Sequence, residues 1–214
     1  MARLRTGVLI SGRGSNLQAL IDACAARDYP AEIVLVAANR GDAAGLERAV
    51  HAKIPTRIIA HRDFAERAVF DAALDAALKE ARVELVCLAG FMRILGAGFI
   101  DTWRDRMINI HPSLLPEFPG LDTHARALAA GVKRHGCTVH FVRNDVDSGP
   151  IIVQGSVPVL PGDDAGKLAA RVLAVEHRAY PLALRLVADG RVRVRGDSVE
   201  IDGRPGPVRL DAAA

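Results

Sequence analysis

The segment Gly7-Val8-Leu9-Ile10-Ser11-Gly12-Arg13-Gly14-Ser15-Asn16 indicates the architecture most directly, because in it an apolar strand leads straight into a glycine-rich loop. The residues from 16 to 27 then have helical periodicity, with Leu17, Leu20, Ile21 and Cys24 on one face. A strand, a short loop and a helix in direct succession predict the first unit of an α/β fold.

The rest of the first hundred residues continues this alternation. Apolar strands are expected at 32–38, 56–59 and 83–88, and helices at 43–52 and 64–81. Strands that are apolar throughout and alternate with helices are typical of a parallel sheet that is covered on both faces.

The pattern changes after residue 104. Strand-like runs at 136–142 and 151–154 are separated by a short turn, which favours an antiparallel pair. Asp163 or Asp164 is suited to cap a helix that runs to about residue 188. The tail has strand–turn–strand character, and we expect it to be peripheral.

We therefore predict an α/β fold: a Rossmann-like, mostly parallel sheet with helices on both faces and an antiparallel extension in the C-terminal half. No internal repeat or low-complexity linker is evident, so a single domain is expected over residues 1–214. Its βαβ half would cover about 1–103 and its second half about 104–214.

The composition of the chain excludes several classes of protein. Half of the 214 residues are hydrophobic and a quarter are charged, as in globular proteins. No apolar run approaches the roughly 20 residues of a membrane-spanning helix, and the N-terminus lacks a signal-peptide core, so we expect a cytoplasmic protein without a membrane partner.

Basic residues are dispersed and aromatics are sparse, which argues against nucleic-acid binding. The three cysteines, at 24, 87 and 137, fit neither a disulfide framework nor a metal site.

The loop at 11–16 is suited to bind an anion. Glycines permit close approach of the backbone, and the N–H groups and dipole of the following helix attract negative charge. Ser15 and Asn16 could add side-chain donors and cap the helix. We interpret the loop as a cradle for a monophosphate, and the alternative is an ordinary tight turn between strand and helix.

A dinucleotide-binding module is a hypothesis of a different class. Against it, position 17 is Leu where the third glycine of G-x-G-x-x-G would stand. The second apolar strand also ends in Asn39-Arg40 and lacks an acidic residue for a ribose. Both departures argue against NAD, while Arg40 leaves NADP open.

The run Asn109-Ile110-His111-Pro112 places two polar side chains at the end of a strand. Residues two apart point to the same side of a strand, and Pro112 ends it. An uncharged donor beside an imidazole suits a reaction in which a carbonyl oxygen becomes negative while a proton moves. The alternative is a pair of polar residues that only fixes a proline-rich loop.

Asp147 adds a third polar group, in the turn Asp147-Ser148-Gly149-Pro150. A carboxylate near an imidazole fixes the orientation of the ring. Asp147 is otherwise an ordinary turn former. Together with Asn109 and His111 it provides what acyl-type transfer needs: an oxyanion donor, an acid/base and a residue that orients it.

The chain resembles the folate-dependent formyltransferases. The resemblance lies in blocks that run in family order over nearly the whole chain: Ile10-Ser11-Gly12-Arg13-Gly14-Ser15-Asn16-Leu17-Gln18, Leu88-Ala89-Gly90-Phe91-Met92-Arg93-Ile94-Leu95, Asn109-Ile110-His111-Pro112-Ser113-Leu114-Leu115-Pro116, Asp147-Ser148-Gly149-Pro150-Ile151-Ile152, and Glu176-His177 before Tyr180-Pro181.

This resemblance implies 10-formyltetrahydrofolate as co-substrate, the amine of phosphoribosylglycinamide (GAR) as acceptor, a place in de novo purine biosynthesis, and no metal. It implies direct transfer, with Asn109 as oxyanion donor and His111, held by Asp147, as acid/base. The GAR-binding residues implied by motif position are Gly14, Ser15, Asn16, Leu17, Leu173, Ala174, Val175 and Glu176. The folate-binding residues implied in the same way are Arg67, Met92, Arg93, Ile94, Leu95, Asn109, Arg143, Asn144, Asp145, Val146 and Asp147.

Several alternatives stay open. The segment 92–95 could be buried strand-to-helix packing, Arg67 could be solvated, and Glu176 could be an exposed helical residue. The nearest rival is another formyl-folate enzyme, such as formyltetrahydrofolate deformylase or methionyl-tRNA formyltransferase. Both would normally carry an additional domain that we do not expect in this chain. The sequence leaves monomer and homodimer open.

Overall fold

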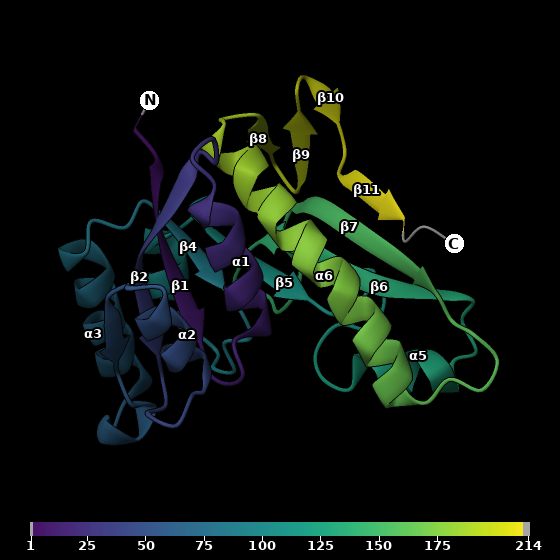
Figure 1. The fold of residues 1–214 in the computed structure, drawn as a ribbon, viewed down its shortest axis with the longest axis horizontal. Coiled ribbons are helices and arrows are strands. Elements are labelled where there is room, and N and C mark those ends of the chain that lie inside the picture. The colour runs from purple at the N-terminus through teal and green to yellow at the C-terminus, as the bar shows by residue number, and fades with distance from the viewer. Residues whose placement is uncertain (1, 212–214) are drawn as a thin grey trace. The chain divides into compact units, whose positions relative to one another are not determined.

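The computed structural model describes residues 2–211 (Figure 1). The chain divides into two compact units, one ending at Asn109 and the next beginning at Ile110. Strand β5 (Met107–His111) carries the chain from one unit into the other. The expectation of a single domain stays a prediction, and each unit is described by itself.

The first unit is built on parallel strands. Its strand order is β5-β4-β1-β2-β3, and every neighbouring pair is parallel. The predicted α/β alternation is therefore confirmed here. The elements are β1 (Leu4–Ile10), α1 (Ser15–Ala25), β2 (Ala31–Ala38), α2 (Gly45–His51), β3 (Thr56–Ile58), the 3₁₀ turn η1 (His61–Asp63), α3 (Arg67–Glu80), β4 (Leu85–Leu88) and α4 (Ala97–Thr102).

Two glycine contacts show how helices cover the two faces of this sheet. A Cβ at Gly7 would lie 2.8 Å from a methyl carbon of Leu78, so α3 packs directly on β1 there. A Cβ at Gly45 would lie 2.7 Å from the Cδ1 of Ile10, so α2 begins against the same strand. Residues 7 and 10 of a strand point to opposite faces, which places α3 and α2 on opposite sides of the sheet.

The second unit contains the predicted antiparallel pair. Strands β6 and β7 pair antiparallel, and α6 packs against both. At the closest point a Cβ on Gly155 would lie 2.2 Å from Val175 of α6. The elements are α5 (Thr123–Ala129), β6 (Arg134–Phe141), β7 (Ile151–Pro158), α6 (Ala165–Ala188), β8 (Val192–Arg195), β9 (Ser198–Ile201), β10 (Arg204–Pro205) and β11 (Val208–Asp211).

The tail contains a pairing that the sequence did not predict. Strands β8, β9 and β10 form a small antiparallel sheet, as the strand–turn–strand pattern suggests. The last strand, β11, lies at the edge of its sheet, where it pairs in parallel with β7 from Val208 to Asp211. The sequence did not indicate this pairing because only four residues take part in it.

Helix starts are confirmed in one case and corrected in the other. The Oδ1 of Asp164 accepts a hydrogen bond of 2.7 Å from the backbone N–H of Lys167, so Asp164 caps α6. Capping of the first helix by Ser15 or Asn16 is wrong. The N-cap of α1 is Gly14, with φ of 70° and no side-chain cap, a backbone conformation that glycine adopts easily.

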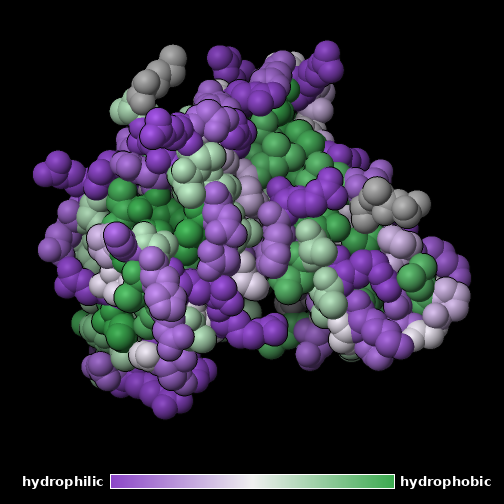
Figure 2. Space-filling model, in the orientation of Figure 1, coloured by the Kyte–Doolittle hydropathy of each residue, from purple (hydrophilic) through white to green (hydrophobic). Residues whose placement is uncertain are grey.

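Hydrophilic side chains cover much of the face drawn in Figure 2. Within residues 2–211, no helix is both long and apolar enough to cross a membrane. Some large apolar side chains are nevertheless exposed, namely Val50, Ile58, Val69, Met92, Ile94, Leu121, Val146 and Leu160. Met92, Ile94 and Val146 fall in the segments that the sequence assigns to a ligand.

Candidate active site

The second unit brings His111 and Asp147 together. His111 is the last residue of β5, and its Nδ1 lies 3.3 Å from the Oδ2 of Asp147. Both side chains are more than nine-tenths buried. A buried carboxylate at this distance fixes the orientation of the imidazole.

The loop after β5 contacts both members of this pair through its backbone. The Nε2 of His111 lies 3.0 Å from the carbonyl oxygen of Phe118. The N–H of Gly120 donates a hydrogen bond of 2.9 Å to the Oδ2 of Asp147. A carbonyl only accepts hydrogen bonds, so the contact with Phe118 requires a proton on Nε2. The loop therefore fixes both the ring and its carboxylate.

Asp147 has a backbone conformation that is uncommon for a residue with a side chain. Its φ is 54°, in the left-handed region. Asp tolerates this region better than most residues, but the conformation still costs about 1 kcal/mol. Residues held in this way by their surroundings are frequent at active sites.

Three further histidines surround the pair. The Nε2 of His140 lies 3.9 Å from the Oδ1 of Asp147, and burial lowers the pKa of His140. Burial also lowers the pKa of His124, and it lowers the pKa of His135 to about 4. The His124 and His135 rings meet edge to face, with centroids 5.2 Å apart. These rings provide a neutral wall, and of the four histidines His111 lies nearest to the carboxylate, at 3.3 Å.

Asn109 belongs to the first unit. It is half-buried, and it pairs in register with Leu88 of the neighbouring strand β4. It precedes His111 by two residues in β5, as the sequence indicates. Its role as an oxyanion donor stays a prediction.

The predicted phosphate loop is held against the start of α2. The carbonyl oxygen of Gly12 accepts a hydrogen bond of 2.9 Å from the N–H of Gly45, and that of Arg13 accepts one of 3.0 Å from the Nε of Arg48. In a trans peptide the N–H points opposite to the preceding carbonyl. The N–H groups of Arg13 and Gly14 therefore point away from α2. Together with the first N–H groups of α1 they are suited to bind an anion.

The residues matched to the glycinamide site lie in the middle of α6. Leu173 is half-buried, Ala174 is exposed and Val175 is buried. Glu176 is also buried, so it is not an exposed helical residue. Burial, followed by the charge of Glu176, raises the pKa of the Cys137 thiol to about 12. Cys137 is thus an inert core residue, and Glu176 is a buried carboxylate suited to a cationic or amine ligand.

The segment 92–95 is not simply buried packing. Met92 and Ile94 are 72% and 65% exposed, while Leu95 is buried. The guanidinium carbon of Arg93 lies 4.8 Å from the centre of the Phe70 ring, and its Nε is buried without a hydrogen-bond partner within the described residues. The backbone N–H of Met92 donates to the hydroxyl of Ser11 at 2.7 Å. The segment is thus anchored at one end and presents apolar side chains.

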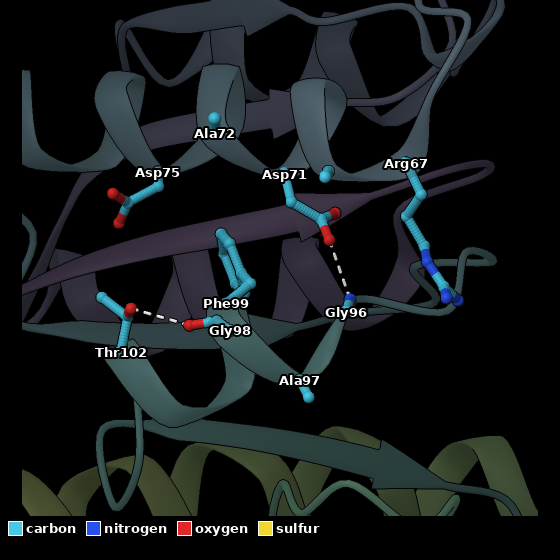
Figure 3. A pocket seen from close by; sticks show the side chains of 10 residues that line it. Arg67, Asp71, Ala72, Asp75, Gly96, Ala97, Gly98, Phe99 and Thr102 are labelled. Carbon is cyan, nitrogen blue, oxygen red and sulfur yellow. Dashed lines mark hydrogen bonds between the residues drawn. The ribbon is translucent and has the colours of Figure 1, made fainter.

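Arg67 lies at the first turn of α3, beside a cavity of about 410 Å³ between α3 and α4. Figure 3 shows Asp71 and Asp75 extending from α3 toward α4, with Arg67 at the end of this row. The Oδ2 of Asp71 accepts a hydrogen bond of 2.8 Å from the N–H of Gly96, which joins the two helices. Arg67 is exposed, so its guanidinium is accessible to an anionic group.

The second loop matched to folate precedes Asp147 directly. Arg143 is half-buried, while Asn144, Asp145 and Val146 are exposed. The hydroxyl of Ser148 donates a hydrogen bond of 2.8 Å to the Asp145 carbonyl, which closes the turn. In the part of the chain that the structure describes, no group of three or more His, Cys, Asp or Glu side chains is arranged to hold a metal ion.

Sequence reasoning missed the backbone groups of Phe118 and Gly120. A carbonyl or N–H group is present at every position, so no residue type indicates which of them will face a catalytic side chain. The only available signal was the Pro119-Gly120 pair, which marks a turn.

Known proteins resemble this chain over most of its length. The model of the formyl transferase family matches residues 4–184. The chain is 44% identical to a phosphoribosylglycinamide formyltransferase of Escherichia coli, over 96% of this chain and 97% of that protein. A solved phosphoribosylglycinamide formyltransferase of Coxiella burnetii is 45% identical, has a TM-score of 0.92, and is covered over 97% of this chain and 99% of that one.

A longer relative matches only in part. The chain is 56% identical to a trifunctional purine biosynthetic protein of Drosophila pseudoobscura pseudoobscura, over 89% of this chain. It spans only 14% of the length of that protein.

Proposed function

This chain belongs to the formyl transferase family, and from that membership we propose that it transfers a formyl group from 10-formyltetrahydrofolate to the amine of phosphoribosylglycinamide. The products would be formyl-GAR and tetrahydrofolate, in de novo purine biosynthesis. The observation that carries the proposal is the buried contact of 3.3 Å between His111 Nδ1 and Asp147 Oδ2.

The proposed reaction is a direct transfer between the two substrates. The acceptor nitrogen attacks the formyl carbon, a new C–N bond forms, and the bond between that carbon and the folate nitrogen breaks. The amine loses one proton and the folate nitrogen gains one. In this scheme Asn109 donates to the oxygen that becomes negative, which is the largest single contribution in many acyl transfers.

His111 moves the proton in this scheme, while Asp147 holds its ring. The Nε2–H of His111, which donates a hydrogen bond to the Phe118 carbonyl, would supply this proton to the substrate oxygen or to the folate nitrogen. The carboxylate of Asp147 stabilises the protonated imidazole during the transfer.

The acceptor would bind through its two ends. Its phosphate would lie at the N–H groups of Gly14, Ser15, Asn16 and Leu17, where α1 begins. Its glycinamide end would meet Glu176, with Leu173, Ala174 and Val175 beside it on α6. A buried carboxylate gains a charge-assisted hydrogen bond from an ammonium or amine group.

The residues present also fit a folate. Exposed Met92 and Ile94 can cover a flat heterocycle, and the uncompensated Nε of Arg93 can donate to a polar group of the ligand. Leu95 and the loop from Arg143 to Asp147 are the other proposed folate contacts. Arg67 would attract the anionic tail from the edge of the α3–α4 cavity.

A folate-product assay with and without acceptor tests this function. We expect the absorbance change of the folate to require phosphoribosylglycinamide, and formyl-GAR to accumulate in equal amount. An equal rate without acceptor would indicate a deformylase. Titration with ribose 5-phosphate and with NADP tests the dinucleotide hypothesis, because only a phosphate cradle should bind the former more tightly.

Two finer properties stay predictions. A cytoplasmic location is one of them, and fractionation of cells that produce the protein would test it. The other is the state of association, monomer or homodimer, which sedimentation of the purified chain would determine.

A further inference from the structure

A buried threonine holds the loop that follows His111. The hydroxyl of Thr138, in β6, donates a hydrogen bond of 2.7 Å to the carbonyl of Ser113 and accepts one of 3.0 Å from the N–H of Leu115. Ser113 and Thr138 are completely buried. Buried polar groups that satisfy one another in this way specify a single arrangement of the backbone.

A buried glutamine on the next strand completes this contact. The Nε2 of Gln154, in β7, donates to the carbonyl of Leu115 at 2.8 Å and to the hydroxyl of Thr138 at 3.2 Å. Both backbone polar groups of Leu115 are therefore bound by side chains. The hydroxyl of Thr138 uses its one donor and both of its acceptor sites.

The side-chain amide of Gln154 is oriented from the C-terminal strand. The Nη1 of Arg209, in β11, donates to the Oε1 of Gln154 at 3.1 Å, and the two residues are direct neighbours in the β11–β7 register. A guanidinium has donors only, so the atom of Gln154 that faces it must be the oxygen. This leaves the amide nitrogen to face Leu115.

We propose that Arg209, Gln154 and Thr138 are positioning residues for the His111–Asp147 pair. The loop that they hold supplies the Phe118 carbonyl to His111 and the Gly120 N–H to Asp147. An amide that turns around would present an oxygen to the Leu115 carbonyl and release the loop. This inference rests on the proposed function and assigns a role in it to the C-terminal strand.

The family match ends at residue 184, whereas β11 begins at Val208. The contact from Arg209 thus lies outside the region that the family model matches. A second contact holds the same strand, because the guanidinium of Arg134 binds the Asp211 carboxylate at 2.5 Å. Loss of Arg209 alone should therefore leave β11 in place.

The test compares substitutions along this series of contacts. Arg209→Met should lower kcat on the order of threefold to tenfold, the equivalent of one hydrogen bond, with KM for both substrates unchanged. Thr138→Val, which keeps the shape and removes the hydroxyl, should lower kcat by about 10²-fold, as expected when a reacting group is displaced. Thr138→Ser keeps the hydroxyl and should stay within about twofold of the unsubstituted protein.

NMR titration of the labelled His111 imidazole is the second readout. Its titration midpoint should move in Arg209→Met and in Gln154→Glu, because the Asp147 carboxylate loses its fixed position. Arg195→Met is the matched control. Arg195 is an exposed strand arginine, and within the described residues the structure shows one polar contact of its side chain, with Glu200 at 3.1 Å. The substitution should change neither kcat nor the titration.

The proposal is overturned if Arg209→Met matches Arg195→Met in both readouts. It is also overturned if the His111 imidazole has the same titration midpoint in Thr138→Val as in the unsubstituted protein. Absence of formyl transfer in the unsubstituted protein would refute the proposed function alone, because the imidazole titration still decides whether these residues position the pair.

Discussion

The N–H of Gly120 and the ring of His111 share one oxygen of Asp147: Oδ2 lies 2.9 Å from the Gly120 nitrogen and 3.3 Å from the His111 Nδ1. The carboxylate is thus held by a backbone group as well as by the residue that it orients. A carboxylate that accepts a backbone hydrogen bond keeps its place when the imidazole gains or loses a proton.

Asp147→Asn should therefore change the pH dependence of the reaction. The amide keeps the size of the side chain and removes the negative charge that favours a protonated imidazole. We expect the limb of the pH–rate profile assigned to His111 to shift to lower pH, with a lower maximal rate. Measurement of kcat/KM across pH checks this, and an unshifted profile would contradict coupling between the two residues.

Asn109→Ala should reduce turnover far more than folate binding. Removal of one oxyanion donor typically lowers kcat by about 10²–10³-fold, because the contact forms fully only in the transition state. The dissociation constant of the folate, measured without acceptor, should change little. Near-normal kcat in this variant would rule out the role of oxyanion donor.

Gly45→Ala should selectively weaken binding of the phosphorylated acceptor. The added methyl would lie 3.0 Å from the Cα of Gly14 and 2.7 Å from the Cδ1 of Ile10, so the phosphate loop or α2 must shift. We expect an increased KM for the acceptor and a loss of stability of about 1–3 kcal/mol. The KM for folate should stay unchanged.

Gly41→Ala is the control for this substitution. Its methyl would meet only Ile58, at an ordinary contact distance of 4.0 Å, although Gly41 lies only four residues before Gly45. Equal acceptor KM values in the two variants would show that the contact between Gly14 and Gly45 does not position the loop.

The buried histidines should make the free energy of unfolding depend on pH. The pKa of His135 is lowered to about 4, from an ordinary value of 6.5 that applies in the unfolded chain. Between these values the unfolded state binds more protons, so stability is fully present above about pH 6.5 and falls as pH decreases toward about 4. Urea unfolding at several pH values measures this slope.

His135→Phe should reduce this pH dependence. The phenyl ring can keep the edge-to-face contact with Phe118, whose ring centroid lies 5.9 Å from that of His135. It carries no titratable group, so the remaining slope in this window should come from other buried histidines such as His124. A slope equal to that of the unsubstituted protein would contradict the assignment to His135.

Much of the fold could be predicted because its strands are apolar throughout. The expected strand at 32–38 corresponds to β2 (Ala31–Ala38), and the expected helix at 64–81 corresponds to α3 (Arg67–Glu80). The short helix α4 gave no such signal. Helix α4 has six residues and contains Gly98, so its periodicity covers fewer than two turns.

In the candidate site, the side-chain members could be predicted from the sequence and the backbone members could not. The pairing of His111 with Asp147 could be inferred because both residue types have an acid/base or orienting role. Their backbone partners depend on how the loop after β5 folds back onto the pair. The contact from Arg209 to Gln154 depends on how the chain returns to β7 after more than fifty residues. No local pattern carries that information.

The positive φ angles of Phe118, Asp122 and Asp147, between 52° and 55°, have a consequence for adaptation to heat. At each of these positions a residue with a side chain adopts a backbone conformation that glycine adopts without strain. Replacement by glycine therefore removes local strain and also increases the conformational freedom of the backbone. Selection for a higher melting temperature should not favour these glycine replacements, because they loosen the segment that aligns the reacting groups. Variants adapted to warmth should instead gain their stability in the parallel-stranded unit.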